Sequence, residues 1–473
     1  MTGLTSVFKD RLRGWRSRRE FWLLAAAAAF LLLLLAVELR TIFRIDVWRF
    51  DAVYYFDSYY YKLRTEGRWI DYLLFPLLKH IPAQLSILAH LFCLWFFGYS
   101  CCREFTEDRA YAAVFGLALL QIHPYFSIFG WPVTTLPTFL LLALLAWQRR
   151  ALPMPWFFIA AGVLFHGGFN NFYDLLPLLF LREISERDLD YLLKLFAWWC
   201  AGYVAGFAVA EAAVFAASLS FIEIAPWRRP HPVRSLADLC WNAQQMAGYF
   251  TAHVQTLLLR GWTQFALGAG LGVALCGSRR RPAAAARLCA ALAAVILSVY
   301  VQTLPIGIKV ALRTAFPLYI GAVSVFILAG RTRAKTAAVV LLCLLAFGLF
   351  QDDVKTAEYY YTVTSTFRNE FRALCGDPPQ YSGVRFIATE YDMKRCVSII
   401  VRKNHLENRL TEGFGSAIRW VPVAQSCGIR DVTFTESSAS LAPSDPNCIY
   451  SHEDVGNYLI LGVNPAFLKA NHM

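Results

Sequence analysis

The chain has 473 residues, of which 57% are hydrophobic and only 16% are charged, and its formal net charge is +12. Several apolar runs are long enough to cross a bilayer, which predicts a polytopic α-helical membrane protein and excludes an ordinary soluble domain. The basic residues are scattered between the apolar runs and no nucleic-acid-binding module is recognisable, so the positive charge does not predict a nucleic-acid partner.

The first apolar run, residues 21–38, follows a cluster of basic residues that begins at Lys9. The positive-inside rule predicts that this basic arm stays in the cytoplasm and that the run leads outward. We do not expect cleavage as a signal peptide, because the run is too long and no small-residue site precedes Glu38.

The loop after this run, residues 46–69, concentrates aspartates, tyrosines and basic residues, and it ends in Gly67-Arg68-Trp69. Carboxylates can act as general bases, guanidinium groups bind phosphate through two parallel hydrogen bonds, and aromatic faces stack on sugar rings. The loop therefore predicts a site for an anionic group and a sugar. The alternative is an interfacial amphipathic helix with an aromatic belt.

Further apolar runs bring the expected number of spans to about eleven. They cover about 82–100, 110–127, 134–148, 155–166, 175–181, 195–219, 265–277, 284–304, 314–330 and 336–350. Basic residues follow the runs that should return to the cytoplasm, and an odd number of spans places the C-terminus outside. The long loop at 221–264 reads as one or two interfacial amphipathic helices.

A polar break, His166 to Asp174, separates the fifth and sixth runs. Broken backbone at membrane depth persists where it lines a polar cavity, so this segment is a candidate binding wall. The side chains expected to face a sugar or to hydrogen-bond in that cavity are His166, Asn170, Asn171, Tyr173 and Asp174. The alternative is a helix-breaking turn whose polar groups are satisfied locally.

Residues 351–473 are more polar and predict a single α/β or α+β domain, with strands near 384–388, 398–401 and 458–461 and a helix at 364–374. Four cysteines lie in this region: Cys375, Cys396, Cys427 and Cys448. An even number in an external domain predicts two disulfides, with all three connectivities open. A zinc site is disfavoured because there is no Cys-x-x-Cys pair.

Several basic residues fall in loops that the topology places outside, among them Arg68, Lys309 and Arg313. The positive-inside rule disfavours positive charge there, so we expect an anionic partner such as a lipid-linked phosphate. The alternative is that Lys309 and Arg313 only anchor a helix end among lipid head groups.

An N-in first helix, an aspartate-bearing external loop closed by Gly67-Arg68-Trp69, roughly ten spans and a periplasmic C-terminal region resemble the membrane-embedded GT-C glycosyltransferases. The nearest resemblance is to the bacterial Gtr type II glucosyltransferases that decorate O-antigen. It covers about residues 1–350, the expected membrane domain, and not residues 351–473. That family often has paired aspartates before its Gly-Arg, whereas this chain has isolated ones, so the catalytic aspartate stays open: Asp51 is preferred for its spacing to Gly67, Asp57 is second and Asp46 is third.

The resemblance implies transfer of a hexose, with glucose as the implied sugar, from a polyprenyl-phosphate donor to an envelope glycan such as O-antigen. The transfer would take place at the periplasmic face of a bacterial inner membrane, by direct inverting displacement. Asp51 or Asp57 would be the base, Arg68, Lys309 and Arg313 would bind phosphate, and Trp69 would contact the sugar. We expect no metal and no cofactor. The alternatives are an O-antigen polymerase or ligase, or a flippase or transporter of lipid-linked sugars; the sequence makes no prediction of oligomeric state.

Overall fold

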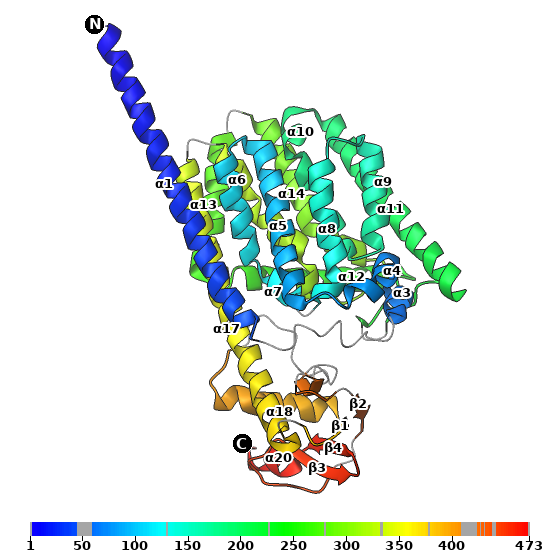
Figure 1. Cartoon of the computed structure of the whole chain (residues 1–473). Helices are drawn as coiled ribbons and strands as arrows, with labels where there is room; N and C mark the ends of the chain where they lie inside the picture. Colours follow the sequence, from blue (N-terminus) through cyan, green and yellow to red (C-terminus); the bar gives the residue numbers. More distant parts are fainter. Residues whose placement is uncertain are drawn as a thin grey trace.

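The fold is a bundle of apolar helices followed by a small mixed sheet near the C-terminus (Figure 1). A computed structural model describes residues 2–44, 59–128, 131–225, 228–278, 281–331, 334–376, 379–407, 423–425, 427–429, 431–437 and 441–471. Within these ranges, five helices are long and apolar enough to cross a membrane. Their cores are Arg19–Ile42, Ala83–Thr106, Leu189–Ser218, Pro282–Thr303 and Lys335–Cys375. These helices suggest a membrane protein, as the sequence predicts.

Two 41-residue helices frame the molecule, α1 (Thr2–Ile42) and α17 (Lys335–Cys375). They pack against each other along one side of the bundle, and α17 then continues out of it to the sheet (Figure 1). The sequence places a domain boundary at residues 350 and 351, but α17 runs through that point without interruption. One continuous helix therefore connects the bundle to the C-terminal region.

The remaining helices of the bundle and its loops are α3 (Tyr60–Glu66), α4 (Trp69–Leu78), α5 (Ala83–Thr106), α6 (Arg109–Ala118), η2 (Leu119–Gln121), α7 (His123–Ile128), α8 (Pro132–Gln148), α9 (Met154–His166), η3 (Asn170–Phe180), α10 (Leu181–Glu186), α11 (Leu189–Ser218), α12 (Leu236–Leu257), α13 (Gly261–Ser278), α14 (Pro282–Thr303), η5 (Leu312–Thr314), α15 (Phe316–Val323) and α16 (Val325–Gly330). Many of these helices overlap the predicted apolar runs, but α3, α4 and α12 lie in predicted loops, and the predicted run at 314–330 is divided between α15 and α16. Helix α12 lies in the loop for which an interfacial helix is predicted. The predicted polar break is confirmed, because α9 ends at His166 and a 3-10 helix begins at Asn170.

Helices α9 and α11 touch through their backbones. A Cβ atom on Gly162 would lie 1.9 Å from the carbonyl oxygen of Gly202, and one on Gly206 would lie 2.2 Å from the carbonyl oxygen of Gly162. Small residues at such a crossing let two membrane helices approach closely. The crossing lies next to the end of α9. His166, the last residue of α9, donates from Nδ1 to the carbonyl of Gly162 at 2.8 Å. A Cβ atom on Gly206 would lie 2.4 Å from the same nitrogen.

We expect Gly162→Val to destabilise the folded protein by more than about 3 kcal/mol, the upper end for an overpacked core. The added atoms would meet backbone, which cannot move aside as a side chain can. The matched control is Gly268→Val on α13, where a Cβ atom has nothing within 4 Å. Thermal unfolding of the two purified variants in detergent measures the difference; equal unfolding midpoints would contradict the contact.

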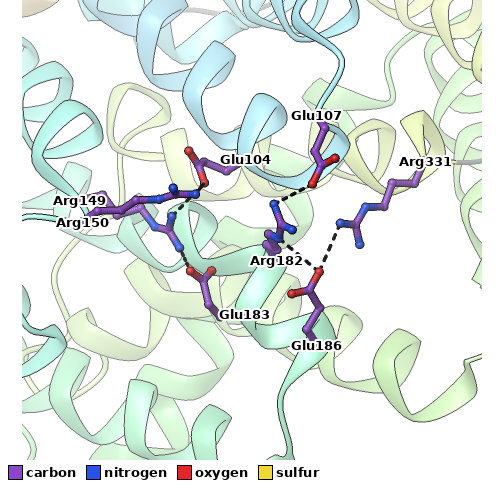
Figure 2. Close-up of polar contacts among 8 residues, drawn as sticks. All are labelled: Glu104, Glu107, Arg149, Arg150, Arg182, Glu183, Glu186 and Arg331. Atoms are coloured by element: carbon purple, nitrogen blue, oxygen red, sulfur yellow. Dashed lines mark hydrogen bonds and ion pairs between the residues drawn. The ribbon is translucent and has the colours of Figure 1, made fainter.

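An ion-pair network ties helix ends together at the end of the bundle away from the sheet (Figures 1 and 2). Its members are Glu104, Glu107, Arg149, Arg150, Arg182, Glu183, Glu186 and Arg331. The side chain of Arg149 is only 5% exposed; it contacts Glu104 at 3.2 Å and also pairs with Glu183. Arg182 pairs with Glu107 at 2.8 Å and with Glu186 at 3.3 Å. The network therefore joins α5, α8, α10 and the turn after α16.

The C-terminal sheet has four strands in the order β2-β1-β4-β3. They are β1 (Gly383–Ala388), β2 (Asp431–Glu436), β3 (Tyr450–Val455) and β4 (Tyr458–Val463), with α18 (Glu390–Lys403) and α20 (Pro465–Ala470) beside them. Strand β1 is parallel to β2 and β4, and β3 is antiparallel to β4. The predicted strands at 384–388 and 458–461 are confirmed. The predicted strand at 398–401 is wrong, because these residues belong to the amphipathic helix α18, in which Ile399 and Ile400 are buried and Ser398 is exposed.

The predicted disulfides are a second correction. The described residues include all twelve cysteines, and no two of them lie at disulfide distance. Cys375, Cys396 and Cys427 are buried in the hydrophobic core, while Cys448 is half-buried. The buried thiols act as small apolar side chains. An even number of cysteines in a polar region was therefore not sufficient to predict bridges.

Candidate functional site

A cavity of about 250 Å³ lies at the end of the bundle where α3, α4 and α12 gather, the same end from which α17 leads to the sheet (Figure 1). Its walls come from five parts of the chain. Four of them are α3 with the turn that follows it, the polar break with α11, residues 222–224 with Arg228, and the segment 299–314; Ile128, Trp131 and Thr135 add a further part. These parts are far apart in the sequence, so the cavity exists only in the folded chain.

Gly67 explains the first wall. It has a φ of +71°, in the left-handed region that glycine adopts without strain, and its N–H closes α3 by donating to the carbonyl of Leu63. The turn brings Glu66 Oε2 within 2.5 Å of a guanidinium nitrogen of Arg68. A Cβ atom at Gly67 would also lie 2.8 Å from Ile222. The Gly-Arg signature in the sequence therefore marks a tight turn that presents Arg68 to the cavity.

The polar break docks directly on this turn. The backbone N–H groups of Ile70 and Asp71 donate to the carbonyl of Gly167 at 2.8 and 3.1 Å. The guanidinium carbon of Arg68 lies 5.2 Å from the centre of the Phe169 ring, a cation–π distance. Two segments that the sequence singles out separately are thus one structural unit.

The segments after α11 and α14 run side by side and form the opposite wall. Lys309 N–H donates to the carbonyl of Arg228 at 3.1 Å, and His231 N–H donates to the carbonyl of Ile306 at 2.9 Å. This pairing carries Arg228, Lys309 and Arg313 to the cavity. The predicted clamp residues from the first loop and from the region near residue 310 therefore share one cavity.

The cavity-lining cations are Lys62, Arg68, Arg228, Lys309 and Arg313. Of these, the sequence assigns a phosphate role to Arg68, Lys309 and Arg313 only. Arg228 and Lys62 fall in loops that the sequence predicts to lie outside, but no sequence signal marks them as neighbours. Among the described carboxylates, Glu66 and Glu211 line the cavity, and Glu211 accepts a hydrogen bond from the N–H of Ile222 at 2.9 Å.

Glu66 is the centre of the charges on this wall. Its side chain is 5% exposed and forms ion pairs with Lys62, with Arg68 at 2.5 Å and with Arg228 at 2.9 Å. Burial raises the pKa of Glu66, but Arg68, Lys62 and Arg228 together outweigh burial and hold its pKa well below the usual range. Burial also lowers the pKa of Lys62 to about 8, although Glu66 opposes that change.

The predicted sugar-binding residues divide into two groups. His166, Asn170 and Asn171 line the cavity, at the end of α9 and the start of η3. Trp69, Tyr173 and Asp174 do not line it, which differs from the sequence expectation.

Local packing explains this difference. The hydroxyl of Tyr173 donates to the carbonyl of Trp199 at 2.7 Å, away from the cavity. Asp174 is fully buried and accepts from the side chain of Gln302, which itself lines the cavity. Trp69 packs on Gly167. These three side chains contact residues of the polar break, α11 and α14 and do not reach the cavity.

The predicted bases Asp51 and Asp57, with Asp46, lie outside the described residues. No family model, no curated protein and no solved structure matches the chain. The cavity itself combines clustered cations, two asparagine amides and an apolar wall that includes Phe207, Ile222 and Ile224. Such a surface suits an amphiphilic ligand with an anionic head and a polar group.

Proposed function

We propose that the protein is a membrane-embedded glycosyltransferase that moves a hexose from a polyprenyl-phosphate donor to an envelope glycan such as O-antigen. The observation that carries the proposal is the convergence of Arg68, Arg228, Lys309 and Arg313 on one cavity of an apolar helical bundle. Arginine forks bind phosphate oxygens in a plane, and lysine adds charge. The apolar wall beside them suits the hydrocarbon chain of a lipid donor.

The proposed reaction is a single displacement. A hydroxyl oxygen of the acceptor attacks the anomeric carbon of the donor sugar, and Asp51 or Asp57 accepts the hydroxyl proton. The bond between the anomeric carbon and the phosphate oxygen breaks, and the polyprenyl phosphate leaves with the bonding pair. Arg68 and Arg313 stabilise the charge that develops on the leaving phosphate. Asn170 and Asn171 are placed to hydrogen-bond a sugar beside it.

We further propose a bacterial inner-membrane location with about eleven spans, a cytoplasmic N-terminus and a periplasmic C-terminal domain. Two features support this orientation. The cavity lies at the end of the bundle from which α17 leads to the sheet, and the network of Figure 2, with four arginines and four glutamates, lies at the other end, as does the N-terminus of α1 (Figure 1). Basic residues concentrate on the cytoplasmic side of membrane proteins.

A transporter of lipid-linked sugars would have to break the ion-pair network of Figure 2. Alternating access requires both ends of the bundle to open in turn. Here α5, α8, α10 and the turn after α16 are joined by ion pairs at the end opposite the cavity, including the buried Arg149. A transferase needs an opening on one side only.

Mass spectrometry of envelope glycans from cells with and without the protein tests the proposal. We expect one additional hexose on the acceptor glycan when the protein is present. If the glycan from cells without the protein lacked whole repeat units, the protein would instead be a polymerase or ligase. Identical glycans in the two cultures would contradict a transferase of any of these kinds.

A further inference from the structure

The carboxylate of Glu66 joins two loops that are about 160 residues apart in the sequence. Its Oε2 atom contacts Arg68, which follows it in the turn after α3. Its Oε1 atom contacts Lys62, one turn earlier on the same helix, and Arg228, from the segment after α11. Both arginines and Lys62 line the cavity.

This arrangement is costly unless every charge in it is needed. A buried carboxylate must be paired, and three neighbouring cations repel one another. The ionised carboxylate of Glu66 lies between the three cations, so it is paired itself and it reduces their mutual repulsion. A chain built only for stability would do as well with apolar residues of similar volume at these positions.

The contacts fix orientation as well as charge. A guanidinium group has five N–H donors in a rigid fork, so a contact to one carboxylate oxygen orients the plane of the group and keeps its capacity to bind a further anion. For Arg68 the plane is also set by the Phe169 ring. For Arg228 the backbone is held by Lys309, at 3.1 Å, while Glu66 holds the head.

We propose that Glu66 is a positioning residue that orients the guanidinium groups of Arg68 and Arg228 toward one phosphate group of the ligand. This inference rests on the proposed function, because it takes the ligand to be a prenyl phosphate. Glu66 is not the general base, since its carboxylate is engaged by three cations. It acts through the arginines, so its removal weakens phosphate binding even where the fold is intact.

The test measures binding of farnesyl phosphate to the purified full-length protein in detergent, by tryptophan fluorescence at pH 7. This pH lies below the pKa of Lys62, which burial lowers to about 8, so most of the Lys62 side chains keep their charge. Glu66→Gln keeps the shape and removes the charge. We expect it to bind roughly tenfold more weakly than the parent, or worse, because each factor of ten corresponds to only about 1.4 kcal/mol.

The matched control is Glu223→Gln. Glu223 pairs with Arg64 at 2.6 Å in the same region, but both side chains are about half exposed. An exposed pair contributes little, so this variant should bind as the parent does. Melting temperatures establish that each variant is folded. If Glu66→Gln does not fold, Glu66→Asp takes its place, because it keeps the charge but cannot span the same contacts.

A double-mutant cycle separates positioning from a general structural role. In an Arg228→Ala background, Glu66→Gln should lose less affinity than it loses in the parent, because one of the two groups it orients is gone. Equal losses in the two backgrounds would overturn the proposal, as would parental affinity in folded Glu66→Gln. If the parent itself binds no prenyl phosphate, both the proposed function and the role of Glu66 fail, whereas the earlier outcomes overturn the role of Glu66 alone.

Discussion

Arg68→Lys and Arg313→Lys are each expected to transfer sugar about a hundredfold more slowly than the parent at saturating donor, a loss on the order of 3 kcal/mol in the transition state. Lysine keeps the charge and the ability to anchor in head groups. It loses the planar fork that binds two phosphate oxygens. Arg68 is also 12% exposed and pairs with Glu66 at 2.5 Å, a geometry that an ammonium group cannot reproduce while it holds phosphate.

Arg64→Lys is the matched control for this experiment. Arg64 lies on the same helix as Lys62 but points to Glu223, with its side chain 44% exposed, and it does not line the cavity. Its substitution should leave the rate unchanged. Parental rates in Arg313→Lys would show that Arg313 is a membrane anchor. Parental rates in both test variants would remove the phosphate clamp from the mechanism.

Asp51→Asn is expected to lower the transfer rate by about 10²–10⁴-fold, the usual contribution of a general base. Among the described carboxylates that line the cavity, neither suits this role. Glu66 is engaged by three cations, and Glu211 accepts the N–H of Ile222. The aspartates of the first loop are then the candidates.

Asp57→Asn and Asp190→Asn complete this comparison. Asp190 lies in the first turn of α11, exposed and paired with Lys194, so its variant should transfer at the parental rate. Single-turnover transfer by each purified variant measures the chemical step directly. Near-parental transfer by Asp51→Asn with a severe loss in Asp57→Asn would move the role of base to Asp57.

The helices were predictable because long apolar runs and the basic residues between them constrain a membrane chain strongly. The break after His166 was predictable for a related reason, since Gly167, Gly168, Asn170 and Asn171 disfavour a continued helix. The proposed phosphate clamp also had a local signal, because arginine and lysine in loops predicted to lie outside depart from the usual charge pattern. Their convergence on one cavity then follows from the fold.

Other features depend on contacts between distant segments, which no local pattern encodes. No sequence pattern around Gly67 marks Glu66 as a site residue, and its partner Arg228 belongs to another loop. Tyr173 and Asp174 are polar, so they suggested a ligand, but their partners are the carbonyl of Trp199 and the side chain of Gln302. The cysteines of the C-terminal region failed as predictors of disulfides, because no two described cysteines lie at disulfide distance and Cys375 and Cys396 are buried in the hydrophobic core.

The most direct measurement uses the purified protein in detergent, a synthetic polyprenyl-phosphate hexose and an envelope glycan extract as acceptor, with the products followed by mass spectrometry. The proposed function predicts release of polyprenyl phosphate together with a glycan heavier by one hexose, and predicts that both signals fall together in Arg313→Lys. Intact donor after prolonged incubation with a panel of hexose donors and acceptor glycans would contradict it.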